Sequence, residues 1–355
     1  MNTHSSGGFL YKAFAVLALA AAGALAVSSV QAAGIISNGT VALGVKDTGA
    51  LNVGGGTPIS GPSFTSPGSG TVGGTGVRGL FVNGTSGYEA TFPGCLCEGW
   101  GAAVASLGIT GYDGNGFSNL TPISAVFGTD GGGNGIATTT VRINNASGAP
   151  VLEVVHDFKP SASAYLYQVD VTISNISGAD LGAGATDLRY TRLMDFDTEP
   201  TAFDEFITIG GHPATNLLYT DDNGFQAADP LGGRSAIACA VSVNFTDCGP
   251  TDHGAAFDFG FPALLAGESR LLTIFYGAAP TQLAADLARA AVGAEVFAYG
   301  QPNTRLGPSL GDPITYIFGF KGVGGTPAGV PEPATLALMG LGLAGLGALR
   351  RRKVA

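Results

Sequence analysis

The central part of the chain repeats one pattern, in which short segments of alternating apolar and polar residues are separated by turn-forming residues. In residues 167–173, tyrosine, valine and isoleucine alternate with glutamine, aspartate and threonine. A period of two places one face of a β-strand in a core and the other in water. Similar segments predict strands at 137–143, 151–158, 164–173, 187–196, 206–209, 236–243, 270–276 and 314–320.

One helix is predicted among these strands. Thr281 is a suitable N-cap and Gly293 a suitable end, and Leu283, Leu287 and Ala291 fall on one helical face. We therefore expect an all-β fold, an antiparallel β-sandwich of roughly ten strands with one short helix packed on it. We assign this sandwich to residues 33–325 as one domain.

The composition excludes two classes of protein. The chain has 58 glycines, only 12% charged residues and 45% hydrophobic residues, whereas disordered chains are highly charged and poorly hydrophobic. Its formal net charge is −10, and five of its sixteen basic residues lie in the two terminal segments, so the predicted sandwich is more acidic than the whole chain. A phosphate backbone would be repelled by so acidic a body, so we expect no nucleic-acid partner.

Residues 1–32 have the three parts of a secretory signal peptide. Lys12 closes a polar segment, an apolar run follows at 13–27, and small residues at 30 and 32 predict cleavage between Ala32 and Ala33. An N-terminal membrane anchor is the alternative, but the apolar run is short for one. We therefore expect export across the inner membrane after cleavage by signal peptidase.

The C-terminal segment, residues 326–355, also has three parts in a fixed order. Pro331, Glu332 and Pro333 precede an apolar stretch at 334–349, and four basic residues follow at 350–353. Sixteen helical residues extend roughly 24 Å, slightly short of a bilayer core of about 30 Å. The basic cluster would stop transfer and remain in the cytoplasm. These features predict a hydrophobic helix that spans the inner membrane transiently.

This arrangement resembles the PEP-CTERM sorting signal of Gram-negative bacteria. The resemblance implies that exosortase, an inner-membrane protease-transpeptidase, recognises the Pro-Glu-Pro motif and detaches the tail. The expected destination is then the cell envelope, the outer surface or the extracellular matrix. Stretches at 94–101, 187–201 and 293–296 are also similar to a set of exported PEP-CTERM proteins without assigned activity. That second resemblance would extend over most of residues 34–325.

Acidic residues gather after the predicted strand at 187–196. In an extended chain Asp195, Asp197 and Glu199 point to the same side about 6.6 Å apart, and two more carboxylates follow at 204 and 205. Oxygen ligands at this density suit Ca²⁺. We therefore take Asp195, Asp197 and Glu199 as a candidate calcium site. A solvated acidic loop and paired-carboxylate glycoside hydrolysis are the alternatives.

Four cysteines in an exported chain predict disulfide bonds. Cys239 and Cys248 are close enough in sequence to close a hairpin-sized loop, whereas a direct bond between Cys95 and Cys97 would be strained. Crossed bridges between the two pairs remain open. A Cys₄ zinc site is a further alternative, but it needs reduced thiols.

No motif in the body identifies a reaction. The chain has no G-x-S-x-G elbow, and its two G-x-G-x-x-G matches are not followed by a helical pattern. We therefore expect a structural or adhesive protein without catalytic residues and without a required cofactor, with exopolysaccharide as a possible partner. A secreted carbohydrate-active enzyme and a calcium-stabilised carbohydrate-binding module are the alternatives.

Overall fold

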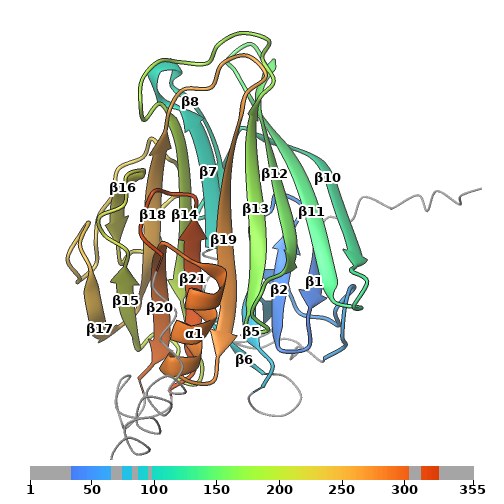
Figure 1. Cartoon of the computed structure of the whole chain (residues 1–355), viewed down its shortest axis with the longest axis vertical. Helices are drawn as coiled ribbons and strands as arrows, with labels where there is room; N and C mark the ends of the chain where they lie inside the picture. The colour runs from blue at the N-terminus through green and yellow to red at the C-terminus, as the bar shows by residue number, and fades with distance from the viewer. Residues whose placement is uncertain (1–32, 65–73, 82–86, 95–97, 304–312, 328–355) are drawn as a thin grey trace, which may run out of the picture.

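The computed structural model describes residues 33–64, 74–81, 87–94, 98–303 and 313–327. Two layers of antiparallel β-sheet, with one helix on the outside, make up this part of the chain (Figure 1). The predicted all-β sandwich is therefore confirmed. The predicted signal peptide lies outside the described residues, as do the Pro-Glu-Pro motif, the apolar segment at 334–349, Cys95 and Cys97.

The first layer is a nine-stranded sheet in which all neighbouring strands are antiparallel. In spatial order its strands are β10 (Leu120–Thr129), β11 (Gly135–Asn144), β12 (Pro150–Pro160), β13 (Leu166–Asn175), β19 (Ser269–Ala279), β21 (Thr315–Lys321), β20 (Val296–Pro302), β15 (Glu205–Gly210) and β17 (Phe245–Thr251).

The second layer consists mainly of a six-stranded sheet. Its order is β16 (Leu217–Asp221), β18 (His253–Phe261), β14 (Leu188–Phe196), β7 (Glu98–Val104), β8 (Ile109–Asp113) and β9 (Phe117–Ser118). A single 3₁₀ turn, η1 (Ala105–Leu107), connects β7 to β8. Within this layer β14 is central, and it pairs with β18 on one side and with β7 on the other.

The N-terminal residues form further strands outside the segments in which the sequence analysis predicted strands. A four-stranded sheet contains β1 (Ala33–Ser37), β2 (Val41–Lys46), β5 (Val77–Gly79) and β6 (Tyr88–Glu89), and β3 (Val53–Gly54) pairs with β4 (Gly74–Thr75). The described residues thus hold 21 strands rather than roughly ten. Strands of two or three residues are too short for an alternation to be recognised in the sequence.

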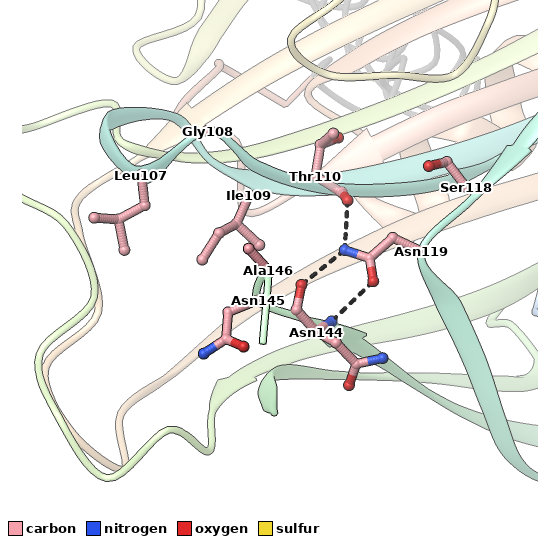
Figure 2. A pocket seen from close by; sticks show the side chains of 9 residues that line it. All are labelled: Leu107, Gly108, Ile109, Thr110, Ser118, Asn119, Asn144, Asn145 and Ala146. Carbon is pink, nitrogen blue, oxygen red and sulfur yellow. Dashed lines mark hydrogen bonds between the residues drawn. The ribbon is translucent and has the colours of Figure 1, made fainter. Parts of the chain in front are cut away.

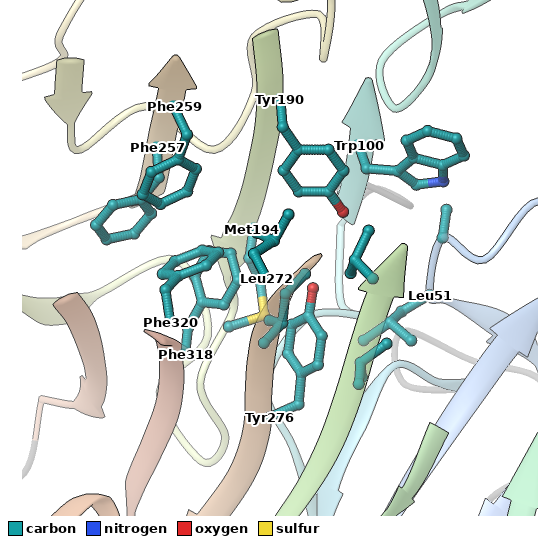
Figure 3. Close-up of a cluster of buried hydrophobic side chains, with 14 of the residues drawn as sticks. Leu51, Trp100, Tyr190, Met194, Phe257, Phe259, Leu272, Tyr276, Phe318 and Phe320 are labelled. Atoms are coloured by element: carbon teal, nitrogen blue, oxygen red, sulfur yellow. The ribbon is translucent and has the colours of Figure 1, made fainter. Parts of the chain in front are cut away.

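The core fills the space between the two layers. On β13 the alternation is realised as predicted, because Val169, Val171 and Ile173 are fully buried while the intervening residues are partly exposed. Aromatic side chains from both layers meet at the centre, where Phe257 of β18 packs against Phe318 and Phe320 of β21 (Figure 3). The sandwich is therefore closed by large interdigitating side chains.

The α-helix of the described residues, α1 (Gln282–Val292), packs on the outer face of the nine-stranded sheet (Figure 1). Its ends confirm the prediction, since the Thr281 side chain accepts a hydrogen bond from the Ala284 N–H and Gly293 adopts φ 68°. The predicted buried face is wrong. Leu283 and Leu287 are 67% and 44% exposed, and the helix packs through a stripe of smaller residues: Ala285, Ala288 and Val292.

The strand predicted at 236–243 is also wrong. The backbone N–H groups of Ile237, Ala238 and Cys239 donate to the Asp222 carboxylate instead of to a neighbouring strand. Val241 and Val243 are 44% and 45% exposed. A side chain distant in sequence thus replaces the ladder hydrogen bonds that a strand would make.

Candidate functional site

Two of the predicted calcium ligands lie where β14 leaves the six-stranded sheet. Asp195 is still paired with Gly254 of β18, and Asp197 follows the last residue of the strand. Close backbone packing fixes this strand end. A Cβ atom on Gly224 would lie 2.4 Å from the Asp195 Cα, and one on Gly254 would lie 2.2 Å from the Met194 carbonyl oxygen. Only glycine fits at these two positions without a backbone shift.

Two further carboxylates from other segments join this strand end. The register pairs Phe196 with His253, so that Asp252 lies beside Asp197. One carboxylate oxygen from each of Asp195, Asp197 and Asp252 lies within 4.8 Å of the other two. Glu205, the first residue of β15, adds its negative charge to the same group. We call these four residues the carboxylate cluster: Asp195, Asp197, Glu205 and Asp252.

Glu199 does not belong to the cluster. Its carboxylate accepts a hydrogen bond from the Glu89 N–H at 2.8 Å. The extended spacing that placed three carboxylates on one side ends with β14, since the strand stops at Phe196. Asp252 was not found from the sequence because only the pairing of β14 with β18 brings it to Asp197.

The cluster is almost completely removed from solvent. Asp195, Asp197 and Glu205 are at most 1% exposed, and Asp252 is half-buried. Burial raises the pKa of Asp195 to about 10, with the charge of Asp197 adding to the effect. Burial likewise raises the pKa of Asp197 to about 8 and that of Glu205 to about 9, and both feel the charge of Asp252. Four acidic groups thus share a space in which their charged forms are unfavourable.

Several oxygens of the cluster have no hydrogen-bond partner among the described residues. They are both oxygens of Asp197, Oε2 of Glu205 and Oδ1 of Asp252. The neighbouring His253 ring is engaged elsewhere, because Nδ1 lies 3.2 Å from Asp222 Oδ2 and Nε2 lies 3.2 Å from the Glu205 carbonyl oxygen. The cluster therefore presents oxygen ligands alone, the kind of donor set that binds hard cations.

A second group of possible ligands, Asp222, Cys239 and His253, has a structural explanation. Cys239 is bonded to Cys248, which confirms the predicted local disulfide and excludes crossed bridges for this pair. Burial opposes ionisation of Asp222, but the His253 hydrogen bond and three backbone N–H groups outweigh it and lower the pKa of Asp222 to about 2. The carboxylate anchors the 237–239 loop and has no need of a metal.

A buried ion pair lies farther inside the sandwich. The Arg192 Nε of β14 is 2.6 Å from Glu98 Oε1 of β7, and both side chains are fully buried. Glu98 also accepts hydrogen bonds from the Leu51 N–H and from the Tyr276 hydroxyl, and Arg192 donates to the Gly49 carbonyl oxygen. These contacts join the six-stranded sheet to β19 of the nine-stranded sheet and to the N-terminal region.

His156 of β12 borders this pair and makes the stability depend on pH. Its Nε2 lies 3.2 Å from the Tyr190 hydroxyl and 3.5 Å from an Arg192 nitrogen, and its ring contacts Trp100. Burial, and then the positive charge of Arg192, hold the pKa of His156 well below its ordinary value. The histidine is therefore neutral in the folded protein.

We expect the wild-type protein to lose stability relative to His156→Phe as the pH falls below about 6.5. The unfolded wild type takes up a proton there that the folded state does not bind, so its free energy of unfolding falls by up to about 1.4 kcal/mol per pH unit. Urea denaturation of both proteins between pH 5 and 7.5 measures this difference, and subtraction cancels the titrations that they share. Parallel stability curves would show that His156 is protonated in the folded state.

An open pocket of about 610 Å³ lies at the end of β8, beside the turn that joins β11 to β12 (Figure 2). Asn119 occupies its wall and donates to the carbonyl oxygens of Thr110 and Asn144. Its amide thus ties neighbouring segments together. The residues that line the pocket include no acidic residue, histidine, lysine or cysteine, so it offers no side chain that could act as a general acid or base.

Comparison with known proteins identifies the C-terminal end of the chain. Residues 329–353 match the PEP-CTERM protein-sorting motif, which confirms the prediction made from Pro331, Glu332 and Pro333. The motif supports an exported, cell-envelope-associated protein that exosortase processes. No curated protein matches the chain. Within the described ranges no helix combines the length and the apolar character needed to cross a bilayer, and the predicted span at 334–349 lies outside those ranges.

Proposed function

We propose that this chain is a structural or adhesive protein of the cell envelope or extracellular matrix of a Gram-negative bacterium, placed there by exosortase. The observation that carries the proposal is the sorting motif at residues 329–353, which follows an extensive β-sandwich. A chain with this tail is exported from the cytoplasm. What it does there depends on the surface that the sandwich presents.

The described part of the sandwich favours binding over catalysis. The carboxylates that would have to act on a sugar, Asp195, Asp197 and Glu205, are at most 1% exposed. A polysaccharide cannot reach such groups, whereas a glycosidase needs its two carboxyl groups on either side of the bond that it cleaves. The geometry therefore favours a non-catalytic protein over the carbohydrate-active enzyme that the sequence left as an alternative.

One edge of the nine-stranded sheet supports a role in assembly. Among the described residues no strand pairs with the outer side of β10, and its Ile123 and Val126 are both 43% exposed. An open edge strand can pair with a strand of another chain. Such an edge suits a protein that acts by contact at a surface.

The proposed export and processing are tested by measuring the mass and termini of the mature protein from cells with and without exosortase. We expect a start at Ala33 in both cells, and an end near Pro331 only where exosortase is present. Retention of Arg350 and the residues after it in a membrane-bound product of exosortase-containing cells would mean that the tail is an ordinary anchor.

The adhesive role is tested by co-sedimentation of the exported protein with isolated exopolysaccharide and with washed cells of the producing strain. Binding to either is the expected result. Absence of binding to both would contradict the proposal. Turnover of a polysaccharide that disappears in Asp197→Asn would favour the enzymatic alternative instead.

A further inference from the structure

We propose that the carboxylate cluster at the end of β14 binds one Ca²⁺ ion through its four acidic side chains: Asp195, Asp197, Glu205 and Asp252. The ion would serve the stability of the fold. This inference does not depend on the adhesive role, because it rests on the buried geometry of the cluster alone.

The first argument is the charge that the fold brings together. Oxygens from Asp195, Asp197 and Asp252 lie within 4.8 Å of one another, and Glu205 adds a fourth acidic group. Asp197, Glu205 and Asp252 form no ion pair with a lysine or arginine of the described residues. Buried carboxylates are costly unless they are paired or coordinate a metal. A divalent cation supplies the positive charge that this end of the sandwich lacks.

The second argument is independent of charge and concerns hydrogen bonding. Asp197 is fully buried, yet neither of its carboxylate oxygens has a hydrogen-bond partner among the described residues. The same holds for Oε2 of the fully buried Glu205. Buried polar atoms nearly always have partners, so the unsatisfied oxygens point to a bound ion or water. The Asp197 oxygens belong to the group whose carboxylates lie within 4.8 Å of one another, so an ion bound there would give them the partner that they lack.

The donor set selects the ion. All the available ligands are carboxylate oxygens, since the His253 nitrogens face Asp222 and the Glu205 backbone, and the Cys239 sulfur is held in a disulfide. Thiolate and imidazole ligands, which favour zinc and copper, are therefore absent from the described part of the cluster. Ca²⁺ accepts six to eight oxygens at irregular angles, and carboxylates can bind it through one or both oxygens.

The position of the cluster tells what the ion would do. Asp195 and Asp197 come from the end of β14, and Asp252 precedes β18 in the same six-stranded sheet. Glu205 begins β15 in the nine-stranded sheet. One ion would thus join the two layers of the sandwich at this end, and its binding would stabilise the folded state only.

The experiment uses exported protein, purified from cells that express the full chain and then treated with EDTA. Thermal unfolding is followed by the fluorescence of Trp100, the single tryptophan, which is fully buried. We expect calorimetric titration to give one Ca²⁺ per chain. We also expect the melting temperature to rise by about 5 °C or more at a Ca²⁺ concentration one hundred times the dissociation constant.

Two variants locate the ion. Asp197→Asn is expected to lose at least about tenfold in Ca²⁺ affinity, and most of the Ca²⁺-dependent rise in melting temperature with it. In EDTA it should melt at or above the wild-type temperature, because a neutral amide avoids the cost of burying an ionisable carboxyl group, so the loss cannot be attributed to misfolding. Glu199→Gln is the matched control, as this nearby acidic residue lies outside the cluster, and it should respond to Ca²⁺ as the wild type does.

Three results would overturn the proposal. The first is a wild-type melting temperature that Ca²⁺ leaves unchanged, with no heat of binding. The second is a Ca²⁺ response that survives in both Asp197→Asn and Glu205→Gln, which would place the ion elsewhere. The third is stabilisation by Zn²⁺ alone, which would contradict the oxygen-only donor set.

Discussion

Replacing Arg192 with methionine is expected to lower the free energy of unfolding by about 3–5 kcal/mol, because Glu98 is then left buried with an unpaired charge. Both side chains are fully buried, and the Arg192 Nε lies 2.6 Å from Glu98 Oε1. Methionine keeps most of the apolar volume of the arginine stem, so the change isolates the charge. Urea denaturation followed by Trp100 fluorescence measures the loss.

Two companion variants show whether the burial of the pair is responsible. Arg192→Met combined with Glu98→Gln removes both charges and should recover at least half of the loss, since replacing both partners leaves no unpaired charge. Arg142→Met breaks a surface ion pair of similar geometry, in which the Arg142 Nε lies 2.9 Å from Glu153 Oε2. The Arg142 and Glu153 side chains are 40% and 27% exposed. It should cost no more than about 1 kcal/mol. Equal losses from Arg142→Met and Arg192→Met would contradict the argument.

Phe257→Ala is expected to destabilise the protein by about 3–5 kcal/mol, because it opens a cavity at the centre of the sandwich. The Phe257 ring centroid lies 5.4 Å from that of Phe318 and 4.8 Å from that of Phe320 (Figure 3). These contacts hold β18 of one layer against β21 of the other. Chemical denaturation of the exported protein measures the change.

Phe117→Ala provides the control for this substitution. Phe117 lies on β9 and is 58% exposed, so its removal leaves no cavity and should change the stability by no more than about 0.5 kcal/mol. A loss from Phe257→Ala as small as that from Phe117→Ala would contradict the prediction, because it would mean that the core closes around the missing ring.

Several strands of the nine-stranded sheet could be predicted because their signal is local, whereas β10, β17 and β20 of the same sheet lie outside the predicted segments. Buried and partly exposed positions alternate along all ten residues of β11, and in residues 167–173 of β13 apolar and polar residues alternate in step with burial. The N-terminal strands could not be predicted in this way. β3, β4 and β6 have two residues each, too few to show a period of two.

The helix shows where a local pattern stops being sufficient. Thr281 and Gly293 set its two ends through hydrogen bonding and backbone conformation, which depend on neighbouring residues alone. Its orientation depends on the sheet beneath it. Two stripes of α1 have helical spacing, and the stripe of smaller side chains faces the sheet, which leaves Leu283 and Leu287 in solvent.

The sorting motif, the all-β class and the ends of the helix could be read from the sequence alone, since each depends on residues near one another in the chain. The sequence left the pairing of Cys239 open, and the structure shows its bond to Cys248. The membership of the carboxylate cluster follows from the fold and not from any local pattern. Asp252 reaches Asp197 through the pairing of β14 with β18, and Glu205 arrives from the other sheet. Glu199, close in sequence, turns away to the Glu89 backbone. Burial and charge act between segments that the fold brings together, and no local pattern encodes those distances.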